Sequence, residues 1–236
     1  MARPLIQSPF VLRCVALLFP LSCGQIAVIA ADDLKSDRVS QSDGSDIFNG
    51  RDLTGWVPVG KGANADWAVE DRCLVCHGKG HTWLRTAKQY DNFHLMLEYQ
   101  VSPGANSGVY VRVGTDGNHH RENSSSPSAG FEVQILDDHS PRYSQLKDYQ
   151  YSASLYDIAG ALRRVSKPAG QWNSLDIECV GEHVTIRHNA TLVVDATPQR
   201  YPLLKLRNTR GFLGLQSHNG IVRFRHLRIS PPVSRS

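Results

Sequence analysis

The sequence predicts an all-β fold, an antiparallel two-sheet β-sandwich of the jelly-roll kind. Three observations predict it. Apolar and polar residues alternate in about ten short segments, turn-forming Gly, Pro, Asn and Asp residues separate those segments, and no long amphipathic helical pattern interrupts them. The length of 236 residues and the hydrophobic fraction of 41% fit one domain with a sizeable core.

The clearest expected strand covers residues 93–101, where every second residue from Phe93 to Val101 is apolar, so that one face is buried. Ser102-Pro103-Gly104 ends this strand with turn-forming residues. The same alternation predicts later strands at 109–113, 131–135, 175–179, 184–187, 192–195, 211–216 and 221–225. The turn at 188–190 makes a hairpin of the two strands that flank it.

Residues 140–162 do not follow the strand pattern and are rich in tyrosine. We expect this segment to be a structured loop at one edge of the sandwich. Loops in such positions often carry binding or catalytic residues, because a rigid scaffold places them.

The first residues have the pattern of a signal peptide, which we assign to 1–31. Arg3 and Arg13 supply the basic part, apolar runs follow, and the small residues Ala30 and Ala31 precede two aspartates. This pattern predicts an exported protein, either periplasmic or secreted.

The apolar stretch is interrupted at Pro20, so we expect no transmembrane span. Cys23 resembles a lipoprotein site, but Pro20 stands where an aliphatic residue is needed, and we do not expect a lipid anchor.

Residues 32–45 are polar and predict a flexible linker, which leaves 46–232 for the sandwich. The net charge of +4 is small and scattered, which argues against a nucleic-acid partner.

Six short motifs, in this order, resemble those of the 3-keto-disaccharide hydrolase family. They lie at 47–56 (IFNGRDLTGW), 67–71 (WAVED), 102–109 (SPGANSGV), 130–137 (GFEVQILD), 171–173 (QWN) and 215–218 (LQSH). The resemblance covers nearly all of the chain that follows the linker. It implies a concanavalin A-like, laminarinase-like jelly roll, and a hydrolase for glycosides whose sugar is oxidised at carbon 3.

Strand parity predicts which polar side chains share a face. Glu132 and Gln134 lie opposite the apolar face of their strand, and Tyr110 and Arg112 share one face of theirs. If the polar faces form one surface, it suits hydroxyl-rich ligands and holds Glu98, Tyr110, Arg112, Glu132, Gln134, Gln216 and His218. The resemblance adds Asn106, from the third motif, as a substrate-binding residue.

The chemistry expected of this surface differs from that of an ordinary glycosidase, which needs two carboxylates. The position that follows Glu132 on the same face is Gln134. A 3-keto sugar needs only one base to remove the hydrogen at carbon 2, and a donor for the enolate. Glu132 or His218 could be the base, and Arg112, Gln134 or a divalent metal could stabilise the oxyanion. The alternatives are a non-catalytic carbohydrate-binding module and a laminin-G-like adhesion domain.

Cys73, Cys76 and His77 match the c-type haem attachment motif, but the segment predicts a strand, so we expect no haem. With Cys179, these cysteines are expected to be buried thiols, or one disulfide and one free thiol. The adjacent His119 and His120 lie in a polar loop and are expected at the surface rather than in a metal site.

Overall fold

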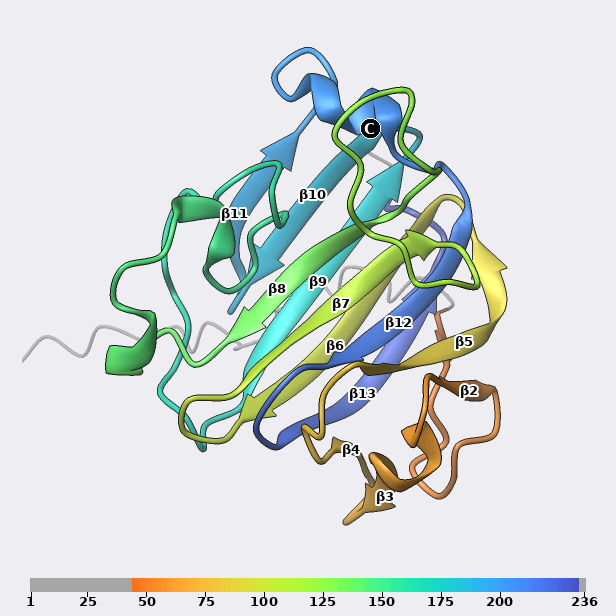
Figure 1. The fold of residues 1–236 in the computed structure, drawn as a ribbon, viewed down its shortest axis with the longest axis vertical. Coiled ribbons are helices and arrows are strands. Elements are labelled where there is room, and N and C mark those ends of the chain that lie inside the picture. Colours follow the sequence, from red (N-terminus) through yellow and green to blue (C-terminus); the bar gives the residue numbers. More distant parts are fainter. Residues whose placement is uncertain (1–43, 234–236) are drawn as a thin grey trace, which may run out of the picture. The chain divides into compact units, whose positions relative to one another are not determined.

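The computed structural model describes residues 44–233, and these form two antiparallel sheets packed face to face (Figure 1). The larger sheet has the order β11-β10-β9-β6-β13-β4-β3, and β1 also pairs with β13. Its strands are β1 (Ser45–Asp46), β3 (Trp67–Glu70), β4 (Cys73–Cys76), β6 (Phe93–Val101), β9 (Asn173–Val180), β10 (His183–His188), β11 (Thr191–Ala196) and β13 (Val222–Ser230).

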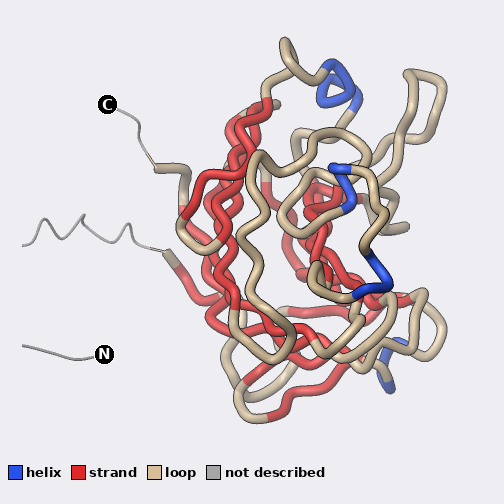
Figure 2. The backbone as a smooth tube through the Cα atoms, turned by 90° about the vertical axis from the view of Figure 1, so that its left-hand side faces the viewer, coloured by secondary structure: helices blue, strands red, loops and turns tan. Residues whose placement is uncertain are grey.

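The smaller sheet has the order β2-β5-β12-β7-β8 and covers one face of the larger one (Figure 2). Its strands are β2 (Trp56–Val59), β5 (Thr82–Tyr90), β7 (Asn106–Val113), β8 (Phe131–Leu136) and β12 (Gly211–Ser217). The predicted all-β sandwich is therefore confirmed. Strand β5 was not expected from the alternation pattern, although it lies inside this sheet, between β2 and β12.

The core lies between the two sheets and follows from the alternation. Along β6 every second side chain is buried, from Phe93 to Val101. In the smaller sheet Val109, Val111 and Val133 point toward the same core. Burial of this apolar surface supplies most of the driving force for folding. The opposite side chains of β7 and β8 are left on the outer face of the smaller sheet.

The tyrosine-rich segment covers the free edge of β8. Ala153 donates its backbone N–H to Gln134 O at 2.8 Å, and Gln134 donates to Ser154 O at 3.0 Å. Tyr156 donates to Glu132 O at 2.9 Å. The segment thus pairs with the backbone N–H and C=O groups of β8, as another strand would. These bonds hold the segment beside Glu132.

Four short 3-10 helices lie in the connections between strands: η1 (Ala63–Ala65), η2 (Pro141–Tyr143), η3 (Asp148–Gln150) and η4 (Pro202–Leu206). Among residues 44–233 no helix has the length and apolar character needed to cross a bilayer.

The expected signal peptide (1–31) and Cys23 lie outside the described residues, as does most of the expected linker (32–45). The sandwich begins at Ser45 with β1, one residue before the expected boundary, and its last strand ends at Ser230.

The haem-like motif forms strand β4, and Cys73, Cys76 and Cys179 are all buried and free. Burial raises the pKa of Cys76 to about 11 and that of Cys179 to about 12, so both thiols are protonated at neutral pH. His77, the last residue of the motif, lies 3.4 Å from the carboxylate of Glu70.

Candidate functional site

The outer face of the smaller sheet carries a row of polar side chains from adjacent strands. Tyr110 on β7 pairs with Glu132 on β8, and Gly108 pairs with Gln134. On the other side of β7, Tyr110 pairs with Gly214 of β12, two residues before Gln216. Strand alternation thus brings Tyr110, Glu132, Gln134 and Gln216 onto one surface, as predicted.

Glu132 is the most enclosed carboxyl group of this face. Its side chain is 3% exposed and leans over strand β7 at Gly108. A Cβ atom at Gly108 would lie 2.1 Å from Glu132 Oε1, so this position has room for the carboxyl group only because it is glycine. Burial raises the pKa of Glu132 to about 8.

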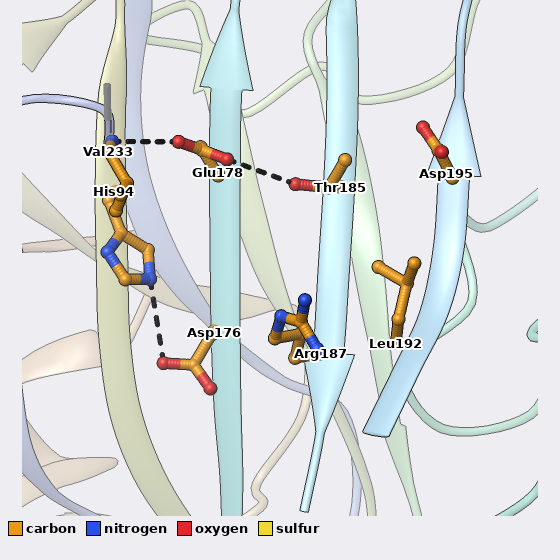
Figure 3. Close-up of a pocket in the computed structure, with 8 residues that line it drawn as sticks. All are labelled: His94, Asp176, Glu178, Thr185, Arg187, Leu192, Asp195 and Val233. Carbon is orange, nitrogen blue, oxygen red and sulfur yellow. Dashed lines mark hydrogen bonds and ion pairs between the residues drawn. The ribbon is translucent and has the colours of Figure 1, made fainter. Parts of the chain in front are cut away.

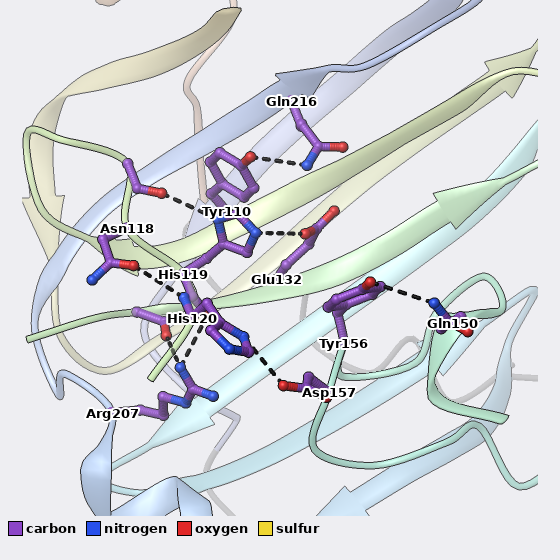
Figure 4. A network of polar contacts seen from close by, with 12 residues as sticks. Tyr110, Asn118, His119, His120, Glu132, Gln150, Tyr156, Asp157, Arg207 and Gln216 are labelled. Atoms are coloured by element: carbon purple, nitrogen blue, oxygen red, sulfur yellow. Dashed lines mark hydrogen bonds and ion pairs between the residues drawn. The ribbon is translucent and has the colours of Figure 1, made fainter. Parts of the chain in front are cut away.

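The loop after β7 brings His119 to this carboxyl group (Figure 4). His119 Nε2 lies 3.2 Å from Glu132 Oε2, and His119 Nδ1 lies 3.2 Å from the carbonyl oxygen of Gly117. The imidazole is stacked on the Tyr110 ring, with a centroid distance of 4.6 Å and an interplanar angle of 19°. Burial lowers the pKa of His119.

These contacts determine which atoms of Glu132 and His119 carry the protons. The Gly117 carbonyl can only accept, so Nδ1 carries the hydrogen and Nε2 presents its lone pair to Glu132. The carboxyl group, whose pKa is raised, then donates its proton to Nε2. At neutral pH the contact is a hydrogen bond between a neutral acid and a neutral imidazole, with one proton ready to move between them.

Arg207, at the end of η4, anchors the backbone of the histidine loop. Its guanidinium donates to the carbonyl oxygens of His119 at 3.0 Å and Gly130 at 3.3 Å, and it is 6% exposed. Gly130 donates its N–H to Asn118 O at 3.0 Å. The position of His119 is thus set by a buried cation and by the start of β8.

A hollow of about 310 Å³ adjoins the pair over β5, β12 and β7. Trp83 and Tyr110 contribute rings 5.7 Å apart, and Gln216 donates to the Tyr110 hydroxyl at 2.9 Å. His218 also borders the hollow, in the exposed turn after β12. A hollow of this size with aromatic and polar walls suits a small polar ligand.

Three amide oxygens on β7, β8 and β12 are buried without a hydrogen-bond partner among the described residues, and one of them, on Gln216, borders the hollow. They are Oε1 of Gln134, Oε1 of Gln216 and Oδ1 of Asn106. Gln134 is 5% exposed, and a buried unpaired oxygen is costly unless a ligand or water donates to it. These acceptors match hydroxyl groups of a ligand.

Two residues predicted for this surface lie elsewhere. Arg112 has a left-handed φ of 54°, at a point where the register between β7 and β12 shifts, and this turns its side chain away from the polar face. Its guanidinium is 1% exposed and donates to Asp91 O and, at 2.5 Å, to Gly181 O. The expectation that Arg112 stabilises an oxyanion is therefore wrong.

Glu98 lies on β6 of the larger sheet, so it faces away from the smaller sheet altogether. Its carboxylate accepts from Arg225 Nε at 2.6 Å and lies 3.3 Å from His226 Nδ1. The prediction that Glu98 shares a surface with Glu132 is wrong, because parity within a strand does not say to which sheet the strand belongs.

Sequence reasoning did not assign His119 or Trp83 to the site. His119 was expected at the surface because it lies in a polar loop. No pattern in the sequence marks Trp83, because the glycines that leave room for its ring come beside it only in the fold: a Cβ at Gly214 would lie 2.5 Å, and one at Gly117 2.9 Å, from the ring.

A second hollow, of about 320 Å³, lies on the outer face of the larger sheet (Figure 3). Its acidic groups have partners: His94 Nε2 lies 3.6 Å from Asp176, and Glu178 accepts from the backbone of Val233 at 2.9 Å. No cluster of His, Cys, Asp and Glu able to hold a metal ion occurs within residues 44–233. The smaller sheet carries the stronger candidate site, because its carboxyl group, Glu132, is almost fully buried beside a hollow.

Comparison with known proteins agrees with this architecture. A curated protein of Bacteroides thetaiotaomicron, named 3-keto-disaccharide hydrolase, is 28% identical over 221 residues, which cover 78% of this chain and 76% of the relative. A solved structure from Parabacteroides distasonis, described as a candidate glycosyl hydrolase, aligns with a TM-score of 0.66 and 23% identity over 79% of this chain and 93% of the other.

A carbohydrate-binding module from Bacillus subtilis also shares the fold, with a TM-score of 0.51 and 15% identity over 75% of this chain and 96% of that module. The decisive match is to a family model, described as the 3-keto-alpha-glucoside-1,2-lyase-like domain, over residues 43–230. This match spans the whole sandwich from β1 to β13, and the chain belongs to that family.

Proposed function

We propose that this protein cleaves glycosides whose sugar is oxidised at carbon 3, by elimination followed by addition of water. The observation that carries the proposal is the Glu132–His119 pair, buried beside a hollow that is bordered by the unpaired amide oxygen of Gln216. The family and the name of the Bacteroides relative support a hydrolase that acts on such sugars.

The pair supplies both the base and the acid. When the Glu132 proton moves to His119 Nε2, the carboxylate that forms can remove the proton at carbon 2, which the neighbouring carbonyl has acidified. The electron pair of that C–H bond moves onto the carbonyl at carbon 3 and gives an enolate. When the carbonyl re-forms, the pair makes the double bond between carbons 1 and 2, and the glycosidic oxygen leaves carbon 1. His119 gives its Nε2 proton to that oxygen. Glu132 is then protonated and His119 neutral, as at the start.

Addition of water reverses these roles. His119 takes a proton from water as its oxygen bonds to carbon 1, and Glu132 returns a proton to carbon 2. The sum of both halves is hydrolysis, and the pair ends unchanged. The amide of Gln134 supplies a donor for the enolate oxygen, and the hydroxyl groups of the sugar donate to Asn106 and Gln216.

The experiment that tests this function compares a chromogenic 3-keto glucoside with its unoxidised parent, with and without divalent metal. The protein should release the chromophore from the keto sugar only. Saturable binding of the sugar without release from either compound would favour the alternative, a carbohydrate-binding module, whose fold this chain shares.

We also propose that the protein is exported, on the basis of the signal-peptide pattern at residues 1–31. Expression of the full chain in a bacterium, followed by fractionation and mass spectrometry of the N-terminus, tests this. A protein that stays in the cytoplasm with residues 1–31 attached would contradict it.

A further inference from the structure

The candidate site extends across the strands on both sides of Glu132. The order across the smaller sheet is β5, β12, β7 and β8, and the tyrosine-rich segment pairs with the free edge of β8. The hollow beside Trp83 therefore lies on one side of Glu132, and Tyr156 lies on the other (Figure 4). A ligand longer than one sugar ring would span the pair.

The tyrosines on the far side form a small, rigid surface. The backbone N–H of Tyr156 is tied to Glu132 O at 2.9 Å, and Gln150 Nε2 donates to the Tyr156 hydroxyl at 3.4 Å. The Tyr149 ring meets the Tyr156 ring edge-on, with a centroid distance of 5.9 Å and an interplanar angle of 79°. Both rings are only partly buried, so neither belongs to the core.

The chemistry of this surface suits a sugar rather than a charged or purely apolar ligand. Ring faces offer apolar area to the C–H groups of a pyranose, while the Tyr156 hydroxyl and the Gln150 amide offer hydrogen bonds to its hydroxyl groups. Lys147 places its Nζ 5.5 Å from the centroid of the Tyr149 ring, which helps to hold that ring in place.

The two sides of the pair fit different halves of a substrate. The oxidised ring needs polar partners around carbons 2 and 3, and the side that carries Gln216, His218 and the hollow has them. The departing sugar needs only a surface that holds it while its oxygen is protonated. Figure 4 shows Tyr156 next to Glu132 on the side away from Gln216.

We propose, on the basis of the function proposed above, that Tyr149 and Tyr156 form the subsite for the departing sugar, and that the hollow beside Trp83 holds the oxidised one. The preferred substrate is then a disaccharide that lies across the strands. Its glycosidic oxygen is placed over the Glu132–His119 pair.

The test compares a 3-keto disaccharide with the methyl glycoside of the same 3-keto sugar, in the wild-type protein, Tyr156→Ala and Tyr156→Phe. Tyr156→Ala should lower kcat/KM for the disaccharide by about 3- to 10-fold, the value of one aromatic contact, and leave the methyl glycoside unchanged. Tyr156→Phe keeps the ring and should keep most of the disaccharide rate. Equal losses on both substrates, or no loss on either, would overturn the subsite.

A separate binding measurement keeps the subsite testable if the proposed chemistry fails. Calorimetry with maltose and with methyl glucoside, neither of them oxidised, should give tighter binding of maltose to the wild-type protein, and Tyr156→Ala should abolish the difference. Equal affinity for both sugars would refute the subsite. Failure to turn over any keto sugar, with maltose still preferred, would refute only the catalytic proposal.

Discussion

The outer faces of the two sheets carry similar residues in different surroundings. On the larger sheet, Glu98 is 33% exposed and paired with Arg225 at 2.6 Å, and Asp176 faces His94 (Figure 3). On the smaller sheet, Glu132 is 3% exposed beneath a histidine loop, and its pKa is raised to about 8. The two carboxyl groups therefore differ because other segments of the chain cover Glu132 and leave Glu98 partly exposed.

The largest effect that tests this comparison comes from Glu132→Gln. The amide still fills the buried space and can donate to His119, but it cannot take a proton from carbon 2. We expect kcat/KM on a 3-keto glycoside to fall by about a thousandfold, as for loss of a general base. Sugar affinity, measured by calorimetry, should change little.

The matched control is Glu98→Gln on the larger sheet, which removes a carboxylate from the same kind of strand position. It should leave kcat/KM unchanged, because the loss of a partly exposed ion pair on the other sheet affects only local stability. If both variants lost activity equally, the contrast between the two faces would have no functional meaning.

His119→Asn should have the next largest effect, a loss of about a hundredfold in kcat/KM, because the leaving oxygen then has no acid. The control is His120→Asn, the next residue in the loop, whose Nδ1 lies 3.1 Å from Asp157 instead of Glu132. Steady-state kinetics of both variants separate the role of the ring that faces Glu132 from general damage to the loop. Comparable losses in the two variants would contradict the assignment.

The polar residues of the strands show how far the sequence predicts the site. Alternation within one strand placed Glu132 and Gln134 together correctly, because it depends only on local backbone geometry. It failed for Glu98, because sheet membership is set by pairing between segments far apart in the chain. It failed for Arg112, because a register shift and a left-handed φ break the period of two.

His119 could not be placed from its sequence, because its position depends on Arg207, which lies 88 residues further along the chain and holds the loop through a backbone carbonyl. The motif Ser102–Val109 did contain a useful signal in Gly108. Its meaning, space for the carboxyl group of Glu132, becomes visible only when β7 and β8 are paired.

The third prediction concerns stability and pH. Glu132 has a raised pKa, so between pH 6.5 and pH 8 the unfolded chain has released this proton and the folded chain still holds it. The free energy of unfolding therefore falls by about 2 kcal/mol as the pH rises through this window. Below pH 6.5 the lowered pKa of His119 acts in the opposite direction and masks the effect.

Urea unfolding at pH 6.5 and pH 8 measures this directly, with Glu132→Gln as the reference because its side chain cannot ionise. The wild-type protein should lose stability relative to that variant over this interval, and Glu98→Gln should follow the wild type. Parallel pH dependence of the wild type and Glu132→Gln would mean that Glu132 ionises in the folded protein as it does in the unfolded chain.

The smallest expected effect, about tenfold in kcat/KM, comes from Gly108→Ala, which adds a methyl group where Glu132 Oε1 now lies. The atoms that must yield are the end of a flexible side chain, so the fold should survive while the carboxyl group shifts away from His119. Combining Gly108→Ala with Glu132→Gln isolates this cause. If the methyl group acts only by displacing the carboxyl group, the double variant should have the same kcat/KM as Glu132→Gln alone. A further tenfold loss in the double variant would mean that the methyl group interferes with binding of the sugar itself.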